Sequence, residues 1–349
     1  MVNQHKLGIK HKKVNIFNPA ANILIMDELD NYMLKKVAKG GIIIFTGITL
    51  SFGIFFFYKV LAARYLGPAD YGLLTLGITI LNIASIFGLA GVHHGIGKLV
   101  NHYLAKKQHG KVKGIIASSF IITITLSIIM FLLLHYSSSF IGEKLFKLQG
   151  LSRIISIFSI GVPFSVLTQL LKYYFFALKS PQYTLLSESL SEKMLNLMFL
   201  IAVMLLSASV YALSWAYVAS LVVSSVVGML IFNSKIKGAL RRESRHKLDF
   251  KSVISFSLPL MLNGILGVIL AWTDTVFIGI FKSDADVGVY NAAYVISSAL
   301  MIFWLSFGNI FYPIISELYA RKAVTLIRKI FEIASRWIFI LAFPVFIIV

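Results

Sequence analysis

Nine apolar runs, most of them about 20 residues long, constrain the fold of this chain more than any other feature of its sequence. A helix of ~20 residues spans the ~30 Å hydrocarbon core of a bilayer and satisfies its own backbone hydrogen bonds there. The runs are continuous and do not alternate between apolar and polar residues, which excludes a membrane β-barrel. They predict transmembrane helices at roughly 40–62, 73–92, 114–135, 153–178, 183–206, 211–233, 252–280, 288–310 and 331–349.

The composition agrees with an all-α polytopic membrane protein, because 58% of the 349 residues are hydrophobic and only 13% are charged. The chain contains no cysteine, so disulfides, thiolate nucleophiles and cysteine metal sites are excluded. A net charge of +19 would suit a nucleic-acid-binding protein, but the basic residues lie in the loops between the apolar runs. That placement follows the positive-inside rule of membrane proteins, so we expect no nucleic-acid partner.

The Lys and Arg residues are distributed unequally between the two sets of loops. The loops on the side of the amino terminus, 93–113, 179–182, 234–251 and 317–330, contain 17 of them, and the opposite loops contain 4. Cytoplasmic loops carry such an excess of basic residues. We therefore expect a multi-pass protein of the plasma membrane with a cytoplasmic amino terminus.

A short loop motif between the first two apolar runs recurs later in the chain. A shift of 216 residues brings residues of the motif, and of the helix that follows it, onto identical residues. The matched pairs are Ala69 with Ala285, Asp70 with Asp286, Gly72 with Gly288, Tyr103 with Tyr319 and Lys106 with Lys322. The repeat predicts two homologous helical bundles around a central cavity, which is a transporter architecture.

The repeat also sets the expected domain boundaries. A cytoplasmic tail at 1–38 precedes a first six-helix bundle at 39–233, and a basic cytoplasmic linker at 234–251 leads to a second bundle at 252–349. The tail is expected to be poorly ordered, and the linker to lie on anionic lipid. Under the same shift Val349 corresponds to Leu133, inside the third apolar run. The second bundle is therefore expected to be incomplete, with three helices, as in a truncated product.

Ionisable residues within the apolar runs are the strongest functional signals, because a charge in hydrocarbon costs several kcal/mol unless it faces a cavity or a partner. Lys172 and Glu188 flank the turn at 180–181 at equal distances, so both can lie at one depth. Glu188, Glu192 and Asn196 follow one another at intervals of four and form one stripe on a helix. The stripe is either the polar wall of a substrate cavity or part of an internal salt bridge, and the two are compatible.

Four further charged residues admit more than one interpretation. Lys193 is expected to point away from the stripe, toward the cytoplasmic interface. Asp274 can bind a cation, a proton or a sugar hydroxyl, or it can hydrogen-bond to a neighbouring helix or cap a break in its own. Lys59 and Arg64, near the outer end of the first run, can contact a phosphate or extend to the interface.

The remaining polar motifs do not predict chemistry. His93 and His94 are adjacent, so on a helix they point about 100° apart, and we expect interfacial histidines and no metal site. Gly91 and Gly95 form a GxxxG at a span end, which is weak evidence for helix packing. The sequence has no phosphate-binding glycine loop, no HExxH and no Ser/His/Asp set. We therefore expect no catalytic residues and no cofactor.

Two pairs of segments carry a family resemblance. They are LKKVAKG at 34–40 with LAARYLGPADYGL at 61–73, and DTVFIG at 274–279 with VGVYNAA at 287–293. These segments resemble polysaccharide biosynthesis proteins, the Wzx-type flippases of the multidrug/oligosaccharidyl-lipid/polysaccharide exporter superfamily. The resemblance covers roughly residues 33–349. It implies a MATE-like fold of 12 to 14 helices in two bundles, and translocation of undecaprenyl- or dolichyl-linked oligosaccharide.

These observations predict a flippase that translocates polyprenyl-diphosphate-linked oligosaccharide across the plasma membrane by alternating access. Its expected partners are that substrate, membrane lipids and glycan polymerase or assembly proteins. The candidates for cavity polarity or ion coupling are Lys172, Glu188, Glu192, Asn196 and Asp274, and those for phosphate contact are Lys59 and Arg64.

Three alternatives to the flippase remain. The first is a cation-coupled multidrug exporter of the same superfamily that uses Asp274 as its cation site, and the second is an inactive truncated product. The third, a membrane enzyme, is disfavoured because the longest external loop, about 136–152, has one Glu and no Asp.

Overall fold

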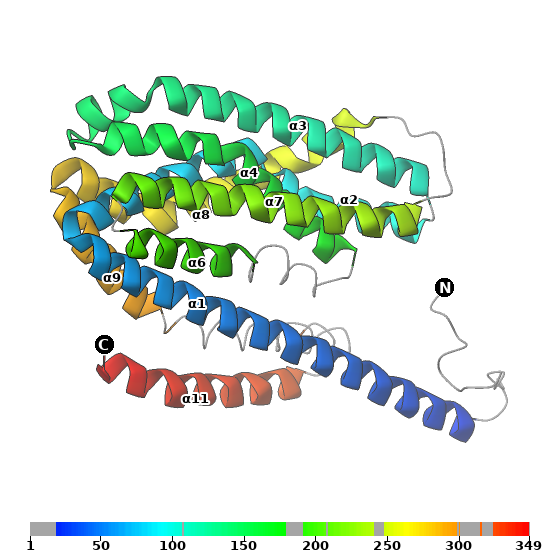
Figure 1. Ribbon diagram of the computed structural model, residues 1–349. Coiled ribbons are helices and arrows are strands. Elements are labelled where there is room, and N and C mark those ends of the chain that lie inside the picture. Colours follow the sequence, from blue (N-terminus) through cyan, green and yellow to red (C-terminus); the bar gives the residue numbers. More distant parts are fainter. Residues whose placement is uncertain are drawn as a thin grey trace.

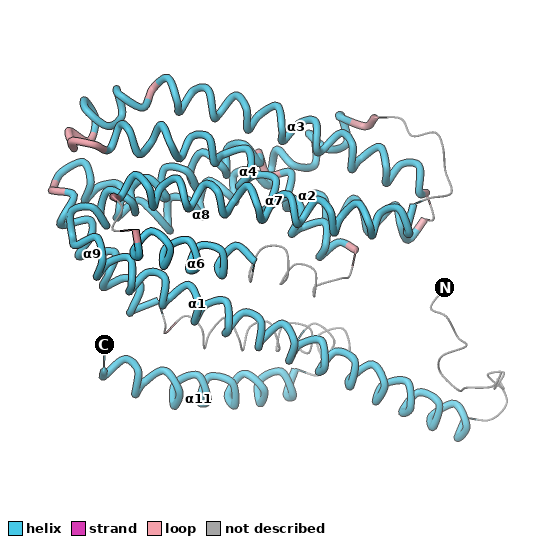
Figure 2. Tube along the Cα trace, viewed as in Figure 1, coloured by secondary structure: helices cyan, strands magenta, loops and turns pink. Residues whose placement is uncertain are grey.

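The computed structural model describes residues 19–106, 108–178, 191–206, 209–240, 248–298 and 324–348, together with residues 300 and 315. Every regular element in these residues is helical (Figure 2). In chain order the elements are α1 (Pro19–Leu89), α2 (Val92–Ala105), α3 (His109–Tyr136), the short π-helix η2 (Phe140–Leu145), α4 (Leu151–Ala177), α6 (Ser191–Leu205), α7 (Val210–Leu240), α8 (Phe250–Phe281), α9 (Asp284–Ser298) and α11 (Val324–Ile348).

In the residues that the structure describes, every regular element is helical, which agrees with the predicted multi-pass, all-α chain. Within the described ranges, 5 helical segments are long and apolar enough to cross a membrane: Thr49–Leu89, His109–Tyr136, Leu151–Ala177, Val210–Ser234 and Phe250–Phe281. The last four coincide with the predicted spans 114–135, 153–178, 211–233 and 252–280. The predicted spans 183–206 and 288–310 lie partly outside the described residues, and α6 and α9 cover the remainder.

The first two predicted spans are the two arms of α1, which bends sharply at Gly67 (Figure 1). Gly67 has φ 74° and ψ 174°, a left-handed conformation that costs glycine little. Pro68 follows and lacks the N–H that would continue the helical hydrogen bonds. α1 already begins at Pro19, so residues 19–38 of the expected tail are helical, while 1–18 lie outside the described residues.

Helices α1, α3, α4, α6 and α7 pack on one another through a shared apolar core, and we refer to these five helices as the first bundle. Aromatic rings form part of its centre. Tyr174 of α4 stacks on Phe120 of α3 with the ring centroids 5.5 Å apart, and its centroid lies 5.2 Å from that of Phe232 of α7. Such pairs contribute about 0.5–1.5 kcal/mol each beyond the burial of their area. The Tyr174 hydroxyl also hydrogen-bonds to the hydroxyl of Ser119.

Many buried hydroxyl groups in this bundle are satisfied by their own helix. Thr75, Ser85 and Thr123 each donate to the carbonyl oxygen four residues earlier, at 2.8 Å. Because no water reaches the hydrocarbon core, this bond removes the cost of burying the hydroxyl. These residues therefore need no ligand to account for them.

α2 occupies the start of the segment 93–113 that was expected to be a cytoplasmic loop. Ala90 (φ 44°) and Gly91 (φ 72°) separate it from α1. A Cβ on Gly91 would lie 2.4 Å from the Ser257 carbonyl oxygen, and one on Gly95 would lie 2.9 Å from the Ser257 hydroxyl. The GxxxG is therefore a close packing surface between α2 and α8.

The two copies of the repeated motif lie against one another where α1 packs on α9, its most extensive helix contact (Figure 1). A Cβ on Gly72 would lie 1.8 Å from the carbonyl oxygen of Asp284. A Cβ on Gly288 would lie 2.0 Å from the carbonyl oxygen of Pro68. The 216-residue shift exchanges these two contacts, so they are equivalent by a two-fold relation. We refer to these four residues as the glycine seam.

The start of α9 is fixed by reciprocal hydrogen bonds between Ser283 and Asp286. The Asp286 carboxylate accepts from the hydroxyl (2.8 Å) and the backbone N–H (3.1 Å) of Ser283, and the Ser283 hydroxyl accepts from the Asp286 N–H (3.2 Å). This is a capping box. The hydrogen bonds from Ser283 lower the pKa of Asp286, so a negative charge remains at the helix N-terminus, which favours it.

We predict that Gly72→Ala or Gly288→Ala destabilises the protein, because either methyl group overlaps a backbone carbonyl that cannot rotate away. Overpacking of this kind costs about 1–3 kcal/mol, which corresponds to a fall in Tm of roughly 2–10 °C. The measurement is thermal unfolding of the detergent-solubilised protein. Gly53→Ala in α1 is the matched control, since a Cβ there meets nothing within 4 Å, and its Tm should not fall. Equal melting of all three variants would contradict the packing described for the seam.

Candidate functional site

A polar cavity of about 210 Å³ lies within the first bundle. Both arms of α1, together with α4, α6 and α7, contribute to its wall. The lining residues are Phe55, Lys59, Ile78, Asn82, Ser165, Thr168, Gln169, Glu192, Lys193, Tyr217 and Leu221. Pockets that enclose drug-sized ligands measure about 300–1,000 Å³. This cavity therefore has room for a small polar group and not for an oligosaccharide.

Lys59 is a buried charge in the wall of the cavity. Only 8% of the residue is exposed, so its side chain does not extend to the interface as the sequence suggested. Among the residues that the structure describes, no carboxylate lies within ion-pair distance of Lys59. Its ammonium group lies 5.5 Å from the ring centroid of Phe55 and 5.6 Å from that of Tyr71. An ammonium group has three donors, and aromatic faces do not satisfy them as an anion would.

Glu192 and Lys193 form an ion pair at the edge of the same cavity. The Lys193 Nζ lies 2.8 Å from the Glu192 Oε1, with 26% and 10% of the two side chains exposed. Lys193 does not point away from the polar stripe, because its long aliphatic stem brings the ammonium group back to the neighbouring carboxylate. Among the described residues that line the cavity, two are lysines and one is a glutamate, so the positive charges exceed the negative charges by one.

Asn196, one turn further along α6, ties the wall of the cavity together. The Ser220 hydroxyl of α7 donates to the Asn196 Oδ1 at 2.5 Å, and both residues are buried. Tyr217, which lines the cavity, lies less than one turn before Ser220. Asn196 thus fixes α6 against α7 and does not itself line the cavity.

Asp274 lies in a separate cluster, where it joins α8 to α9. Its carboxylate accepts hydrogen bonds from the Tyr290 hydroxyl and from the Thr275 N–H, the latter at 2.7 Å. Asn291 donates to the Thr275 hydroxyl oxygen at 3.5 Å in the same cluster. The geometry agrees with the interpretation of Asp274 as a hydrogen-bond acceptor for a neighbouring helix.

Two further candidates, Lys172 and Arg64, do not line the cavity. Lys172 lies near the end of α4, close to His93 of α2, whose ring is also 4.8 Å from that of Tyr173. Burial lowers the pKa of His93 to about 3, and the charges of His94 and Lys172 act in the same direction. Arg64 is exposed beside the bend of α1. Glu188 lies outside the described residues.

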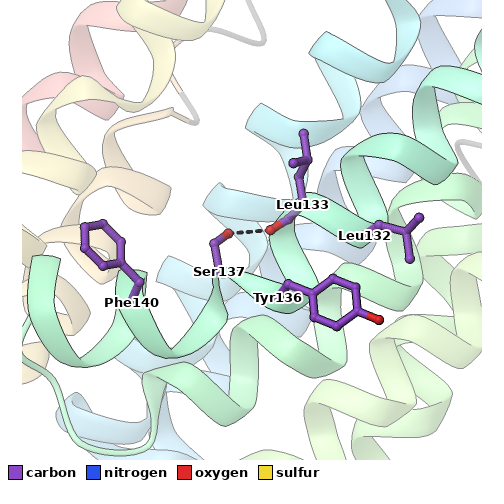
Figure 3. A pocket seen from close by; sticks show the side chains of 5 residues that line it. All are labelled: Leu132, Leu133, Tyr136, Ser137 and Phe140. Atoms are coloured by element: carbon purple, nitrogen blue, oxygen red, sulfur yellow. Dashed lines mark hydrogen bonds between the residues drawn. The ribbon is translucent and has the colours of Figure 1, made fainter.

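A larger cavity, of about 440 Å³, lies at the end of α3 and is lined by Leu132, Leu133, Tyr136, Ser137 and Phe140 (Figure 3). Its one aliphatic hydroxyl, on Ser137, donates to the Leu133 carbonyl oxygen of the same helix (Figure 3). No charged residue lines it, and Tyr136 and Phe140 are exposed. Exposed aromatic residues at the end of a span suit the lipid interface, so this cavity is not the candidate site.

Of the residues that line this cavity, sequence reasoning named Lys59 and Glu192 as site candidates and did not name Lys193, Gln169 or Asn82. The last two are uncharged polar residues inside apolar runs, 153–178 and 73–92. Charged residues inside apolar runs were taken as signals of a cavity or a partner, and a buried amide also needs partners. The same rule applied to amides would have found Gln169 and Asn82. Nothing in the sequence distinguishes a lysine that pairs with its neighbour from one that extends to the interface.

Comparisons with known proteins agree with this geometry. The family model described as "Polysaccharide biosynthesis protein" matches residues 37–319. Among solved structures, the fold is similar to a multidrug resistance MATE family transporter of the MOP superfamily in an inward-facing conformation. The TM-score is 0.59 at 15% sequence identity, over 87% of this chain and 71% of that chain. No curated protein matches the chain in sequence. The family match agrees with the expected polysaccharide biosynthesis family, and the structural match agrees with the expected MATE-like fold.

We predict that Ser220→Ala destabilises the protein by about 1–3 kcal/mol, because it leaves the buried Asn196 oxygen without its donor. Ser224→Ala, one turn further along α7, is the control. Both serines are 0% exposed, but the Ser224 hydroxyl has no hydrogen-bond partner among the described residues. Thermal unfolding should therefore show a lower Tm for the first variant and an unchanged or higher Tm for the second. The reverse order would contradict the Asn196–Ser220 hydrogen bond.

Proposed function

The chain belongs to the polysaccharide biosynthesis protein family, and we propose that it is a flippase that moves polyprenyl-diphosphate-linked oligosaccharide across the plasma membrane by alternating access. The observation that supports this proposal is the buried ammonium group of Lys59, which faces a polar cavity and forms no ion pair within the described residues. A charge in hydrocarbon costs about 2.5–3.5 kcal/mol at the centre of a span. A charged residue that is kept in such a position despite this cost is expected to bind an anionic ligand.

The chemistry of the cavity suits a diphosphate. Lys59 and Lys193 offer charge-assisted donors, and Gln169 and Asn82 can donate to further oxygen atoms. The volume of about 210 Å³ accommodates the diphosphate alone. In this proposal the glycan lies outside the cavity, between the first bundle and α8–α9, and the polyprenyl chain stays in lipid.

The glycine seam supplies an element that can open and close. It brings α1 and α9 into backbone contact at the end of the molecule where Gly67 bends the chain. Alternating access requires that this contact separates when the substrate leaves on that side. From the distribution of Lys and Arg residues we expect this end outside and the amino terminus in the cytoplasm. Glycan polymerase or assembly proteins would then receive the substrate.

The multidrug exporter is less well supported. A cationic drug would enter a cavity whose described lining carries two lysines and one glutamate, and like charges repel strongly where water is scarce. Asp274, the cation site of that alternative, is engaged by Tyr290 and the Thr275 N–H. Efflux of cationic dyes by the purified protein in liposomes would favour the exporter over the flippase.

We predict that Lys59→Gln slows translocation of undecaprenyl-diphosphate-linked oligosaccharide in proteoliposomes by roughly 10- to 100-fold, because a hydrogen bond to a charged group contributes about 1.5–3 kcal/mol. Lys59→Arg keeps the charge and should retain part of the activity. Arg64→Gln is the control, since Arg64 is exposed and outside the cavity, and it should translocate at the rate of the unchanged protein. Equal rates for Lys59→Gln and Arg64→Gln, in folded protein, would refute the proposed site.

Glu192→Gln should act in a different way. Removing the counterion of Lys193 makes the cavity more positive, so the substrate binds more tightly and leaves more slowly. We predict a lower KM together with a lower maximal rate in the same liposome assay. A higher KM with an unchanged maximal rate would show that Glu192 contributes to substrate binding and does not oppose it.

A further inference from the structure

The two ammonium groups of the cavity share one aromatic ring. The Lys59 Nζ lies 5.5 Å from the ring centroid of Phe55, and the Lys193 Nζ lies 5.1 Å from the same centroid. Both distances fall within the ~6 Å over which a cation and an aromatic face attract each other. Lys59 comes from the helix of Phe55, one turn further on, and Lys193 comes from α6. The ring is therefore a contact point between two helices as well as between two charges.

Two like charges in a cavity with little water repel each other, so their proximity needs a physical cause. Lys193 has Glu192 as a counterion at 2.8 Å. Lys59 has no carboxylate partner among the described residues, and its remaining contact is the ring of Tyr71, 5.6 Å away. Aromatic faces are thus what holds the Lys59 ammonium group in place.

A ring differs from a carboxylate in its consequence for a ligand. A carboxylate would neutralise the ammonium group and compete with an incoming anion for its N–H donors. The face of a ring attracts the cation through its quadrupole but accepts no strong hydrogen bond, so the charge and the donors stay available. This is the arrangement that an anion-binding cavity needs.

We propose that Phe55 is a positioning residue, which holds the ammonium groups of Lys59 and Lys193 over one ring so that both can bind a single diphosphate. The inference rests on the proposed function, because it concerns the same cavity. It adds that the affinity for the anion depends on the electron density of an uncharged side chain that cannot itself bind a phosphate.

The test replaces Phe55 by mono-, di- and trifluorinated phenylalanine in the full-length protein. Fluorine withdraws electron density from the ring face with little change in size, so packing is preserved while the attraction for cations falls. Binding is measured with inorganic diphosphate, which reports the anion chemistry alone, and with undecaprenyl diphosphate, which reports the lipid-linked form. We expect affinity to fall stepwise, by about tenfold in total, and Phe55→Trp to bind at least as tightly as the unchanged protein.

Phe57 is the matched control, since it lies on the same helix, is 62% exposed and carries no lysine over its ring in the described residues. Fluorination there should leave both affinities unchanged. Phe55→Leu is a secondary variant, and its Tm shows whether it folds. If Phe55→Leu does not fold, the fluorinated variants still test the proposal.

The outcomes separate the two proposals. A flat fluorination series, with Lys59→Gln still abolishing diphosphate binding, would overturn the role of Phe55 and leave the proposed function intact. Diphosphate binding that is unaffected by Lys59→Gln would overturn the proposed function itself. A stepwise loss of affinity for both undecaprenyl diphosphate and inorganic diphosphate supports the positioning role of Phe55. A stepwise loss for undecaprenyl diphosphate alone also supports that role and shows that the cavity recognises the lipid-linked diphosphate.

Discussion

Polar groups inside the first bundle have to be satisfied without water, and this requirement separates its structural residues from its functional ones. Hydroxyl groups such as that of Thr75 return to their own helix, and Asn196 is bonded to Ser220 on the next helix. Asp274 is satisfied in the same way by Tyr290. Lys59 is a buried charge that has no ion-pair partner within the described residues. The proposed function starts from this unpaired charge.

The cavity and the glycine seam are linked through consecutive residues of α1. The ring of Tyr71 lies beneath the Lys59 ammonium group, and Gly72 follows it in the seam. An anion that draws Lys59 away from this ring acts on the residue next to the tightest contact between α1 and α9. In the proposed function, the distance between the anion site and the contact that separates is therefore short. The proposal thus relates occupancy of the cavity to opening without a long chain of intermediates.

Individual residues show how far sequence reasoning reached. The repeat at Gly72 and Gly288 was visible as identical residues in equivalent places, and the structure shows these positions in reciprocal contact. Gly91 and Gly95 were weak evidence for packing, and they do pack closely, against α8. The predicted direction of the Lys193 side chain was wrong. A flexible side chain can point in several directions, and only the position of Glu192 selects one of them. The segment 93–113 was expected to be a loop because its polarity was read as exposure, yet α2 buries part of it against α8.

The sequence by itself determined the class of the protein, because continuous apolar runs require helices that can span a bilayer. Its repeated motif also predicts two related sets of helices. Both properties can be recognised from the order of residues along the chain, without any knowledge of the contacts between helices. The tertiary structure decided which polar residues meet. That Lys59 lacks a carboxylate partner among the described residues, that Lys193 turns toward Glu192, and that one ring of Phe55 serves both lysines depend on how α1 and α6 pack. Burial and pairing arise from the packing of segments distant in the chain, and local periodicity does not encode them.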